Sequence, residues 1–549
     1  MDANEKMSTT SNQLSQKSVL VVDDYAEMRN VLRAILRSLE ISNFELASNG
    51  NEALTIIRKR RPDIILCDYN LGDGKDGQQV LEEARDRQLI GVETIFVMLT
   101  AENTREMVMA AVEHIPDSFL TKPFTAELLK TRLEKLIQRK ARLSKVDQAL
   151  LAKNYTGAIN GLNSLLADKP KNRLELLKIK AEALISANHL EEARKVYQGV
   201  CDERDVRWAR IGLGNVHLLK KEYPKAEEIL RGLISEDPAI IHAYDLLAKV
   251  LLAEGRLEDA ETILEQAAEL SPRGLKRQVM LAELAFKEGD TESAEKWFRN
   301  AVKLAKHSHH NHPAIYGGLA LSLTANGKHP EAVKVAHELS RNFVGHSEVE
   351  FYRATATAMI KANQGELKEA AAALAIAELE RDAVSGARAS QLGLEMIGVY
   401  AKLGQREKAE AILHNAIANN HDDEGVLKQI KQICENAGLE ETDEKQVNQI
   451  RQEVIKVNNA GVRLIKEGNY EAAIKMLRDA ADKLPGNKTV SLNTAKALIM
   501  KMEQQGVQAD DLHLLRDYIE QVRIVAPDDW RLADVSSRLQ RLMANKEKV

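Results

Sequence analysis

The chain has 549 residues, more than one hydrophobic core normally organises, so we expect either several domains or a repeat array. Aromatic residues make up 4% and charged residues 29% of the chain, which favours helical repeats over β-sandwiches and barrels. The formal net charge of −5 argues against a generally basic nucleic-acid-binding protein, and no apolar run approaches the roughly 18 residues of a membrane span.

The N-terminal segment and the cysteines indicate the compartment. Residues 1–17 are polar and lack the apolar stretch of a signal peptide, so we expect a disordered tail. Cys67, Cys201 and Cys434 are far apart and lack metal-ligand spacing, which favours a reducing environment. The sequence therefore predicts a cytoplasmic protein without membrane insertion.

Short apolar runs alternate with segments of helical period between residues 18 and 138. This alternation is typical of parallel βα units and predicts an α/β domain with a doubly wound, five-stranded parallel sheet. The expected strands are residues 19–22, 44–47, 64–67, 94–99 and 118–121.

Acidic and polar residues directly follow four of these strands. They are Asp23 and Asp24, Asp68, Thr100 and Lys122. Because the carboxyl ends of parallel strands meet at one sheet edge, we expect these side chains to converge. Clustered carboxylates suit Mg²⁺, an ionised Asp can attack phosphorus, and a lysine and a hydroxyl can bind phosphoryl oxygens. Each residue alone would more often be a helix cap or turn residue, but together they predict a phosphoacceptor site.

The segments VLVVDD, IILCDYN, VMLTAE and FLTKPF, in this order and spacing, resemble the receiver domain of two-component response regulators over residues 18–138. The resemblance implies a flavodoxin-like fold in which Asp68 accepts a phosphoryl group from a sensor histidine kinase or a phosphotransfer protein. It also implies phosphoryl contacts from Thr100 and Lys122. The Mg²⁺ ligands that it implies are Asp23, Asp24, Asp68 and the carbonyl of Asn70.

The resemblance further implies a conformational switch. Thr100 and Phe119 match the switch pair of the family, and the peptide bond between Lys122 and Pro123 is expected to be cis. Asn70 and Glu102 resemble the corresponding residues of chemotaxis-type receivers, which implies fast autodephosphorylation.

From about residue 139 the chain repeats itself. Ala226, Ala260 and Ala294 stand 34 residues apart, and Pro238 and Pro272 end successive units at the same interval. A period of this length is typical of helix pairs that bury their apolar faces only by stacking. The pattern resembles the tetratricopeptide repeat and predicts an all-α solenoid over residues 139–423.

Two junctions differ from the regular repeat. Polar and acidic residues interrupt the spacing after residue 419, so 424–453 is expected to be an irregular connector. Residues 454–549 are expected to form further repeats and a capping helix. By contrast, residues 124–156 contain neither Gly nor Pro, so the last receiver helix is predicted to continue into the first repeat.

Three smaller features have competing interpretations. The segment HSHHNH at 307–312 could ligate a metal, but its position between repeats favours a solvated loop. The segment QRKAR at 138–142 could contact nucleic acid, but no aromatic residues are interleaved, which favours a solvated helix face. Cys67 is expected to be a core residue rather than a redox sensor.

Together these patterns predict a phosphorelay response regulator whose repeats bind a protein target. We expect no enzymatic output, since no phosphate-binding loop or nucleophile elbow occurs in the sequence after residue 140. One alternative is a phosphoryl sink, or an inhibitor of phosphotransfer that docks to the kinase or to another regulator. An alternative from another class is a nucleic-acid-binding repeat protein.

Overall fold

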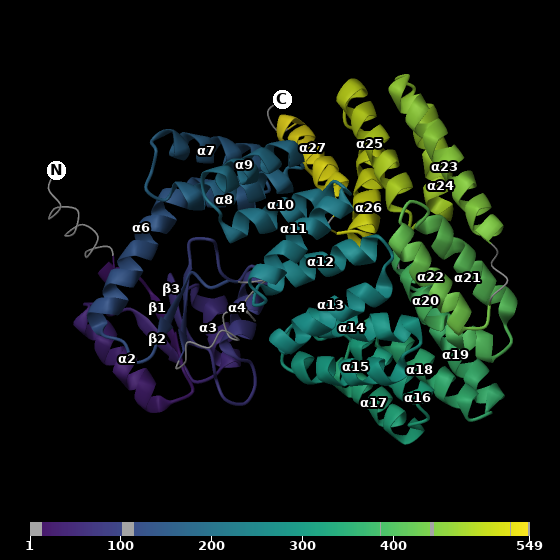
Figure 1. Cartoon of the computed structure of the whole chain (residues 1–549), viewed down its shortest axis with the longest axis horizontal. Coiled ribbons are helices and arrows are strands. Elements are labelled where there is room, and N and C mark those ends of the chain that lie inside the picture. Colours follow the sequence, from purple (N-terminus) through teal and green to yellow (C-terminus); the bar gives the residue numbers. More distant parts are fainter. Residues whose placement is uncertain (1–13, 101–114, 385, 440–443, 528, 547–549) are drawn as a thin grey trace.

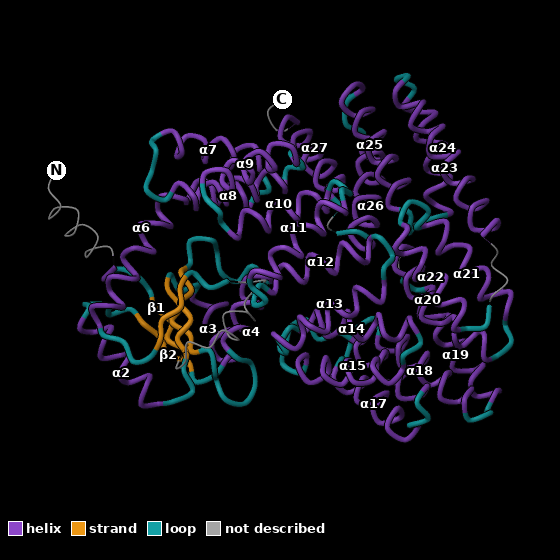
Figure 2. The backbone as a smooth tube through the Cα atoms, in the orientation of Figure 1, coloured by secondary structure: helices purple, strands orange, loops and turns teal. Residues whose placement is uncertain are grey.

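The computed structural model describes residues 14–100, 115–384, 386–439, 444–527 and 529–546. An α/β domain at the N-terminal end is followed by a curved array of helices that fills the rest of the molecule (Figure 1). Within the described residues, the strands are confined to the first domain (Figure 2). The predicted fold class, a parallel α/β domain followed by an all-α solenoid, is therefore confirmed.

The sheet has the strand order β2-β1-β3-β4-β5, and all neighbouring strands pair in parallel. Its strands are β1 Val19–Val22, β2 Phe44–Ala47, β3 Ile64–Asp68, β4 Ile95–Thr100 and β5 Ser118–Thr121. Each lies within one residue of its predicted position. The difference matters at two places, because Asp68 and Thr100 are the last residues of their strands rather than the first residues of the loops.

Helices cover both faces of the sheet. Alternate strand residues point to opposite sides, so Val19 and Val21 pack under α2 (Ala26–Ser38) and α6 (Ala126–Leu151). Leu20 and Val22 pack instead under α3 (Gly50–Arg60) and α4 (Gly77–Asp86). Burial on both faces explains why the strands appear in the sequence as continuous apolar runs rather than as alternating ones.

The folded part of the chain includes residues that were predicted to belong to the tail. Residues 1–13 lie outside the described part of the chain, but Leu14 is 1% exposed and belongs to the core of the α/β domain under α2 and α6. Lys17 also pairs with Asp63 at 2.9 Å. One leucine in a polar segment carries no periodicity, so only the tertiary contact identifies residue 14 as part of the folded domain.

The helical array consists of helix pairs at the predicted interval. The starts of α10, α12 and α14, at residues 207, 241 and 275, are 34 residues apart. Gly289 has a φ of 86° and ends α14, a left-handed conformation in which a side chain would be strained. The first helices of the array after α6 are α7 Tyr155–Ala167, α8 Arg173–Ser186, α9 Leu190–Glu203, α10 Arg207–Leu219, α11 Tyr223–Glu236, α12 Ile241–Ala253, α13 Leu257–Leu270, α14 Leu275–Glu288 and α15 Thr291–Ala305.

The array continues without a break in its core. Its later helices are α16 Pro313–Ala325, α17 His329–Asn342, α18 Val349–Asn363, α19 Leu367–Asp382, α20 Gly386–Lys402, α21 Arg406–Asn419, α22 Glu424–Asn436, α23 Glu444–Lys466, α24 Tyr470–Lys483, α25 Lys488–Gln505, α26 Ala509–Val525 and α27 Trp530–Lys546. One hydrophobic cluster extends from Ala226 to Val535, so residues after 454 share the core of the preceding repeats. Among the described residues, no helix combines the length and apolarity needed to cross a bilayer.

Helix α6 joins the two parts of the molecule. It runs unbroken for 26 residues from Ala126 to Leu151, as the absence of helix breakers predicted. Its first half buries Leu129 and Leu133 in the core of the α/β domain, and its second half buries Leu143 and Val146 against the first repeat. A single helix therefore belongs to both cores.

The expected irregular connector at 424–453 contains helix α22 and the start of α23 instead. Leu427, Ile430 and Cys434 form a buried stripe at helical spacing, and α22 packs against α12 and α14. The acidic residues that suggested irregular structure mark the helix boundary, since the Asp423 side chain accepts a hydrogen bond from the Val426 N–H at 3.3 Å.

Candidate functional site

Asp68 lies at the carboxyl end of the central strand β3. The preceding residues, Ile64 to Cys67, are all 0% exposed, so the strand is held on both faces. An added Cβ on Gly77 would lie 2.2 Å from the Asp68 carbonyl oxygen, so only glycine allows α4 to begin this close to the strand end. The strand and this turn fix the position of the Asp68 carboxylate, which is 12% exposed.

Three carboxylates meet at this edge of the sheet, as predicted. One oxygen each of Asp23, Asp24 and Asp68 lies within 4.8 Å of the others. Asp23 follows β1 and is fully buried, and its backbone N–H donates to the Ala47 carbonyl at 3.2 Å. The parallel pairing of β1 with β2 and β3 thus brings residues separated by more than forty positions into one cluster.

Lys122 bridges the acidic cluster. Its Nζ lies 2.7 Å from Asp23 Oδ2 and 3.0 Å from Asp68 Oδ1, and the peptide bond to Pro123 is cis, as predicted. Burial opposes the charge on Lys122, but hydrogen bonds and attraction from Asp23 and Asp68 outweigh it and raise the lysine pKa. Lys122 is therefore a fixed cation beside the Asp68 carboxylate.

Burial and the neighbouring charges shift the pKa of Asp68 in opposite directions. Burial raises its pKa, attraction and a hydrogen bond from Lys122 lower it, and repulsion from Asp23 raises it again, so that the net pKa is raised. A second cation, in addition to Lys122, would favour the ionised Asp68 carboxylate, which is the form that can act as a nucleophile.

The cluster has the donors and the charge that Mg²⁺ requires. Asp24 Oδ1 is buried and has no hydrogen-bond partner among the described residues. A buried carboxylate oxygen normally has a partner, and a bound cation would provide one here. Three carboxylates and one ammonium group leave two formal negative charges, which a divalent ion balances. Asn70 lies two residues beyond Asp68 and is exposed. The predicted ligation by its carbonyl stays a prediction.

Thr100 and Phe119 lie on neighbouring strands, as the switch prediction requires. Thr100 ends β4, is 7% exposed and pairs in register with Thr121 of β5. Phe119 pairs with Met98 and is half-buried against the core on the α3–α4 side. The predicted role of Thr100 and Phe119 as a conformational switch stays a prediction. Glu102, the other residue of the autodephosphorylation prediction, lies outside the described residues.

Cys67 behaves as a core residue, as expected. It is fully buried, and this burial, followed by the charge of Asp68, raises the pKa of its thiol well above the usual range. A thiol in this state is a poor nucleophile.

The loop that follows Asp68 contacts the array, which the sequence did not predict. The guanidinium of Arg273, between α13 and α14, donates to the Tyr69 hydroxyl at 3.4 Å and lies 3.9 Å from Asp76. Lys75 donates to the His307 carbonyl at 2.5 Å. These partners are about two hundred positions apart, so no local pattern signals them. We name this contact the receiver–array interface; its residues are Tyr69, Lys75, Asp76, Asp86, Arg273, His307, His309 and His310.

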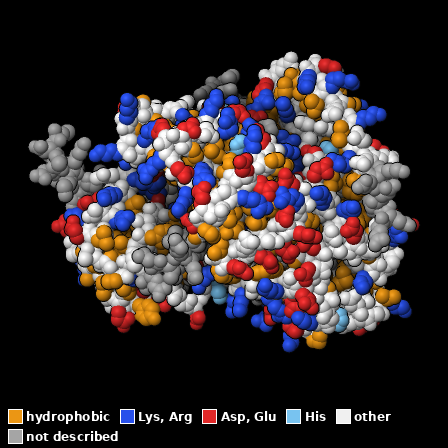
Figure 3. All heavy atoms as spheres, in the orientation of Figure 1, with side chains coloured by type: hydrophobic (Ala, Val, Ile, Leu, Met, Phe, Trp, Pro, Cys, Tyr) orange, Lys and Arg blue, Asp and Glu red, His pale blue; other side chains and the backbone are white. Residues whose placement is uncertain are grey.

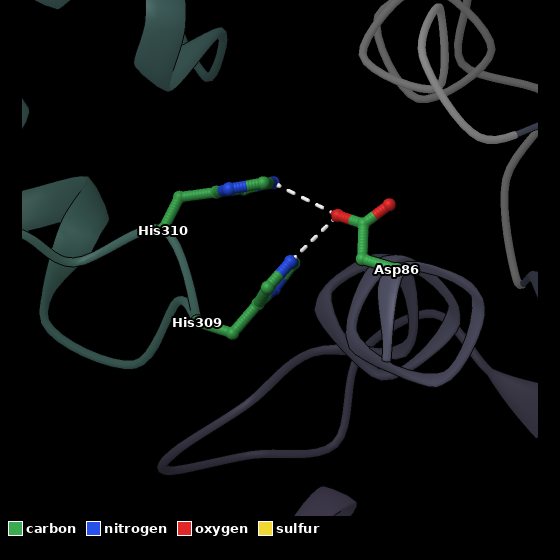
Figure 4. Close-up of side chains that lie close together, drawn as sticks. All are labelled: Asp86, His309 and His310. Carbon is green, nitrogen blue, oxygen red and sulfur yellow. Dashed lines mark hydrogen bonds and ion pairs between the residues drawn. The ribbon is translucent and has the colours of Figure 1, made fainter. Parts of the chain in front are cut away.

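The histidine-rich loop belongs to the same interface. His309 Nε2 lies 2.7 Å and His310 Nε2 lies 3.3 Å from Asp86 Oδ2, at the end of α4 (Figure 4). The expectation of a solvated loop is therefore wrong for His309, whose side chain is 8% exposed. The loop packs on α4, a surface that the sequence around it cannot reveal.

The basic segment at 138–142 also forms contacts with other parts of the chain. Lys140 lies 2.8 Å from Asp117 and donates to the Val92 carbonyl at 2.6 Å, while Arg139 pairs with Glu175 on α8 and lies 3.8 Å from Asp117. On the face shown in Figure 3, basic and acidic side chains are interspersed over the array rather than gathered in one basic patch. The contacts of Lys140 and Arg139 count against a nucleic-acid interface at this segment. The mixed charge on the face in Figure 3 counts against a broad basic surface there.

Comparisons with known proteins agree with this organisation. The family model of the response regulator receiver domain matches residues 19–134, and a model of the tetratricopeptide repeat matches residues 251–309. The chain is 34% identical over 122 residues to chemotaxis protein CheY-3 of Vibrio cholerae serotype O1, which covers 22% of this chain and 92% of the relative. It is 32% identical over 122 residues to chemotaxis protein CheY of Pseudomonas aeruginosa, covering 22% of this chain and 96% of the relative.

Two solved structures were also found to be similar. One is the signal receiver domain of a putative Luxo repressor protein from Vibrio parahaemolyticus, with 23% identity, a TM-score of 0.21, and coverage of 22% of this chain and 91% of that chain. The other is a tetratricopeptide repeat protein from Parabacteroides merdae, with 16% identity, a TM-score of 0.30, and coverage of 46% and 96%.

The alignments cover 92% and 96% of the two chemotaxis proteins. The α/β domain, which the receiver model matches, holds Asp68, Lys122 and the clustered acids at one sheet edge. The chain belongs to the bacterial response regulators and carries an N-terminal receiver domain followed by tetratricopeptide repeats.

Proposed function

We propose that this protein is a phosphorelay response regulator in which Asp68 accepts a phosphoryl group and the repeat array binds a protein target. The donor is the phosphohistidine of a sensor kinase or a phosphotransfer protein. The observation that carries the proposal is the Asp68 carboxylate, held 3.0 Å from Lys122 within a cluster of three acids. The proposed output is stoichiometric binding rather than catalysis.

The residues of the site divide the chemistry among them. A carboxylate oxygen of Asp68 forms a bond to phosphorus as the bond from phosphorus to the donor imidazole nitrogen breaks, and the nitrogen keeps the electron pair. Lys122, now shared between Asp23 and Asp68, neutralises the transferred oxygens, and the Thr100 hydroxyl donates to one of them. Mg²⁺, held by Asp23, Asp24, Asp68 and the Asn70 carbonyl, would supply further positive charge to the same oxygens.

The receiver–array interface supports transmission of the phosphorylation state. Tyr69 directly follows Asp68, and its hydroxyl accepts a hydrogen bond from Arg273 on the array. A shift of the strand end at Asp68 therefore moves a residue that the array already contacts. Helix α6 offers a second, stiff connection, because it belongs to both cores.

Part of the array surface is already occupied by the chain itself. Helix α22 packs against α12 and α14, with Lys428 donating to the Glu254 carbonyl at 3.1 Å and Asn436 donating to the Lys287 carbonyl at 2.6 Å. A target that binds this face must displace α22, whereas a target that binds elsewhere leaves it in place.

Intact-mass spectrometry tests the phosphoacceptor. With Mg²⁺ and a small phosphoryl donor, the full chain should gain one phosphoryl group, and Asp68→Asn should gain none. Asp73→Asn is the matched control, since Asp73 is an exposed acid of the same loop. Undiminished labelling of Asp68→Asn would refute the assignment, and loss of labelling in both variants would point to a general effect of the loop.

A further inference from the structure

Two consecutive histidines of the array and one carboxylate of the receiver domain point toward one another. Asp86 is the last residue of α4, and His309 and His310 lie in the loop between α15 and α16 (Figure 4). One oxygen of Asp86 and one ring nitrogen of each histidine all lie within 4.8 Å of one another. The three potential ligands thus come from two domains that are more than two hundred residues apart in the sequence.

Contacts with the receiver domain hold the histidine loop in position. The His309 side chain is 8% exposed, and its ring lies 3.8 Å from that of His310, centroid to centroid. The loop itself is fixed on the receiver by the hydrogen bond from Lys75 to the His307 carbonyl. The loop is therefore already ordered, so binding an ion would cost less conformational entropy than it would in a mobile surface loop.

We propose that Asp86, His309 and His310 form a binding site for a divalent transition-metal ion, with Zn²⁺ as the representative ion. Imidazole nitrogens and one carboxylate are the donors that Zn²⁺ prefers, whereas Mg²⁺ prefers oxygen donors alone. Two neutral imidazoles and one carboxylate carry one negative charge, which favours a divalent cation. Water completes a four-coordinate site, as in zinc sites with three protein ligands.

The distances fit such a site after a small adjustment. Zinc–nitrogen bonds of about 2.0–2.1 Å in tetrahedral geometry separate neighbouring ligand atoms by roughly 3.3 Å. His310 Nε2 and Asp86 Oδ2 are 3.3 Å apart, while His309 Nε2 and Asp86 Oδ2 are 2.7 Å apart. The second pair is joined by a hydrogen bond, and it must open by about half an ångström as the metal replaces the shared proton.

Metal binding at this position bridges the receiver and the array. An ion that binds only the docked arrangement stabilises it in proportion to metal concentration and affinity. The site would therefore couple metal availability to the strength of receiver–array docking. This inference is independent of phosphorylation at Asp68, and it holds even if the proposed phosphorelay role does not.

Calorimetric titration with Zn²⁺ tests the proposal. The full chain should carry no affinity tag, because a histidine tag would bind the ion, and excess Mg²⁺ should be present to occupy the acidic cluster around Asp68. The wild-type protein should bind one Zn²⁺ at this site. Asp86→Asn, His309→Ala and His310→Ala should each weaken binding at least about tenfold, since a lost ligand costs no less than a lost supporting contact. His307→Ala is the matched control, because His307 is exposed and its side chain lies outside the cluster.

Hydrogen exchange gives a second readout that does not depend on affinity. Zn²⁺ should increase protection of residues 306–312 and 83–90 in the wild-type protein and leave Asp86→Asn unchanged. Asp86→Asn retains an oxygen acceptor for the histidines, so the variant is expected to fold and dock. The proposal is overturned if the wild-type protein binds no Zn²⁺ in excess Mg²⁺. It is equally overturned if Asp86→Asn binds Zn²⁺ as tightly as wild type, since the histidines would then act without the receiver.

Discussion

The guanidinium carbon of Arg273 lies 5.8 Å from the ring centroid of Tyr69, so a residue of the repeat array contacts the residue that follows Asp68. The same guanidinium reaches the Tyr69 hydroxyl and the Asp76 carboxylate. The loop between the proposed phosphoacceptor and α4 is thus part of the surface on which the array docks. Any rearrangement of this loop changes contacts in both domains.

Replacing Arg273 should loosen the receiver–array interface. Arg273→Ala removes a cation–π contact worth about 0.5–1 kcal/mol, which corresponds to a roughly two- to fivefold increase in local opening. Hydrogen exchange should accelerate by this factor in residues 69–77 and 270–276. Arg207→Ala is the control, because Arg207 pairs with Asp237 within the array at 2.7 Å. Unchanged exchange in the 69–77 loop of Arg273→Ala would mean that the contact does not hold the domains together.

Activation of the receiver should be detectable in the array. With Mg²⁺ and beryllofluoride as a phosphoryl mimic, exchange should change in residues 69–77, in the α6 segment 126–151 and in the loops at 270–276 and 306–312. The physical reason is that Tyr69 and α6 connect the site to the repeats. Asp68→Asn should show none of these changes. If changes stay within residues 18–124, the two domains act independently and the phosphoryl-sink alternative gains support.

Loss of one acid should weaken Mg²⁺ binding. Asp24→Asn removes one carboxylate of the cluster, the one whose Oδ1 lacks a hydrogen-bond partner among the described residues. We expect at least about tenfold weaker Mg²⁺ binding and slower phosphoryl uptake, because a ligand and a negative charge are both lost. Calorimetry measures the affinity directly, with Asp73→Asn as control. An unchanged Mg²⁺ affinity in Asp24→Asn would leave the acids with a purely structural role.

Asp117 should stabilise the junction between the sheet and α6. Its side chain is 6% exposed, accepts from the Phe96 N–H at 2.9 Å and lies 2.8 Å from Lys140. Asp117→Ala leaves a buried N–H without an acceptor, which costs about 1–3 kcal/mol, whereas Asp117→Asn keeps an acceptor oxygen. The thermal unfolding temperature should therefore fall more for Ala than for Asn. Equal losses in the two variants would show that the charge, and not the acceptor, is what matters.

Glu288 should make the stability of the array depend on pH. Burial, a hydrogen bond with Glu261 and repulsion from that carboxylate raise the pKa of Glu288 to about 7. The folded state favours the protonated acid, so this contribution is fully present below the unfolded pKa of about 4.3 and is lost as pH rises through about 7. Glu288→Gln resembles the neutral acid, and its unfolding temperature should exceed that of wild type at pH 8 and approach it at pH 5. Glu269→Gln, an exposed change on α13, should keep the wild-type pH profile. A wild-type profile in Glu288→Gln would contradict the prediction.

Local sequence patterns were sufficient to predict the strands, the residues at their ends and the repeat. Strands buried on both faces must be apolar throughout, so β1, β3 and β4 are visible as uninterrupted apolar runs. A parallel sheet then brings the residues that follow these strands to one edge. The same local logic predicted α6 from its lack of breakers and the helix pairs from a period of 34 residues. Each of these features depends on interactions that repeat at short range along the chain.

Tertiary structure alone decided which surfaces meet. Leu14, helix α22, the Arg273–Tyr69 contact and the Asp86–His309 pair were all missed or assigned to solvent. A periodic pattern shows which side of a helix or strand is apolar, but it does not identify the element that covers it. The contact between receiver and array depends on the curvature accumulated over many stacked helix pairs, and a few polar contacts between residues about two hundred positions apart then fix it. For this reason the phosphoacceptor could be predicted from its own segment, and its connection to the repeats could not.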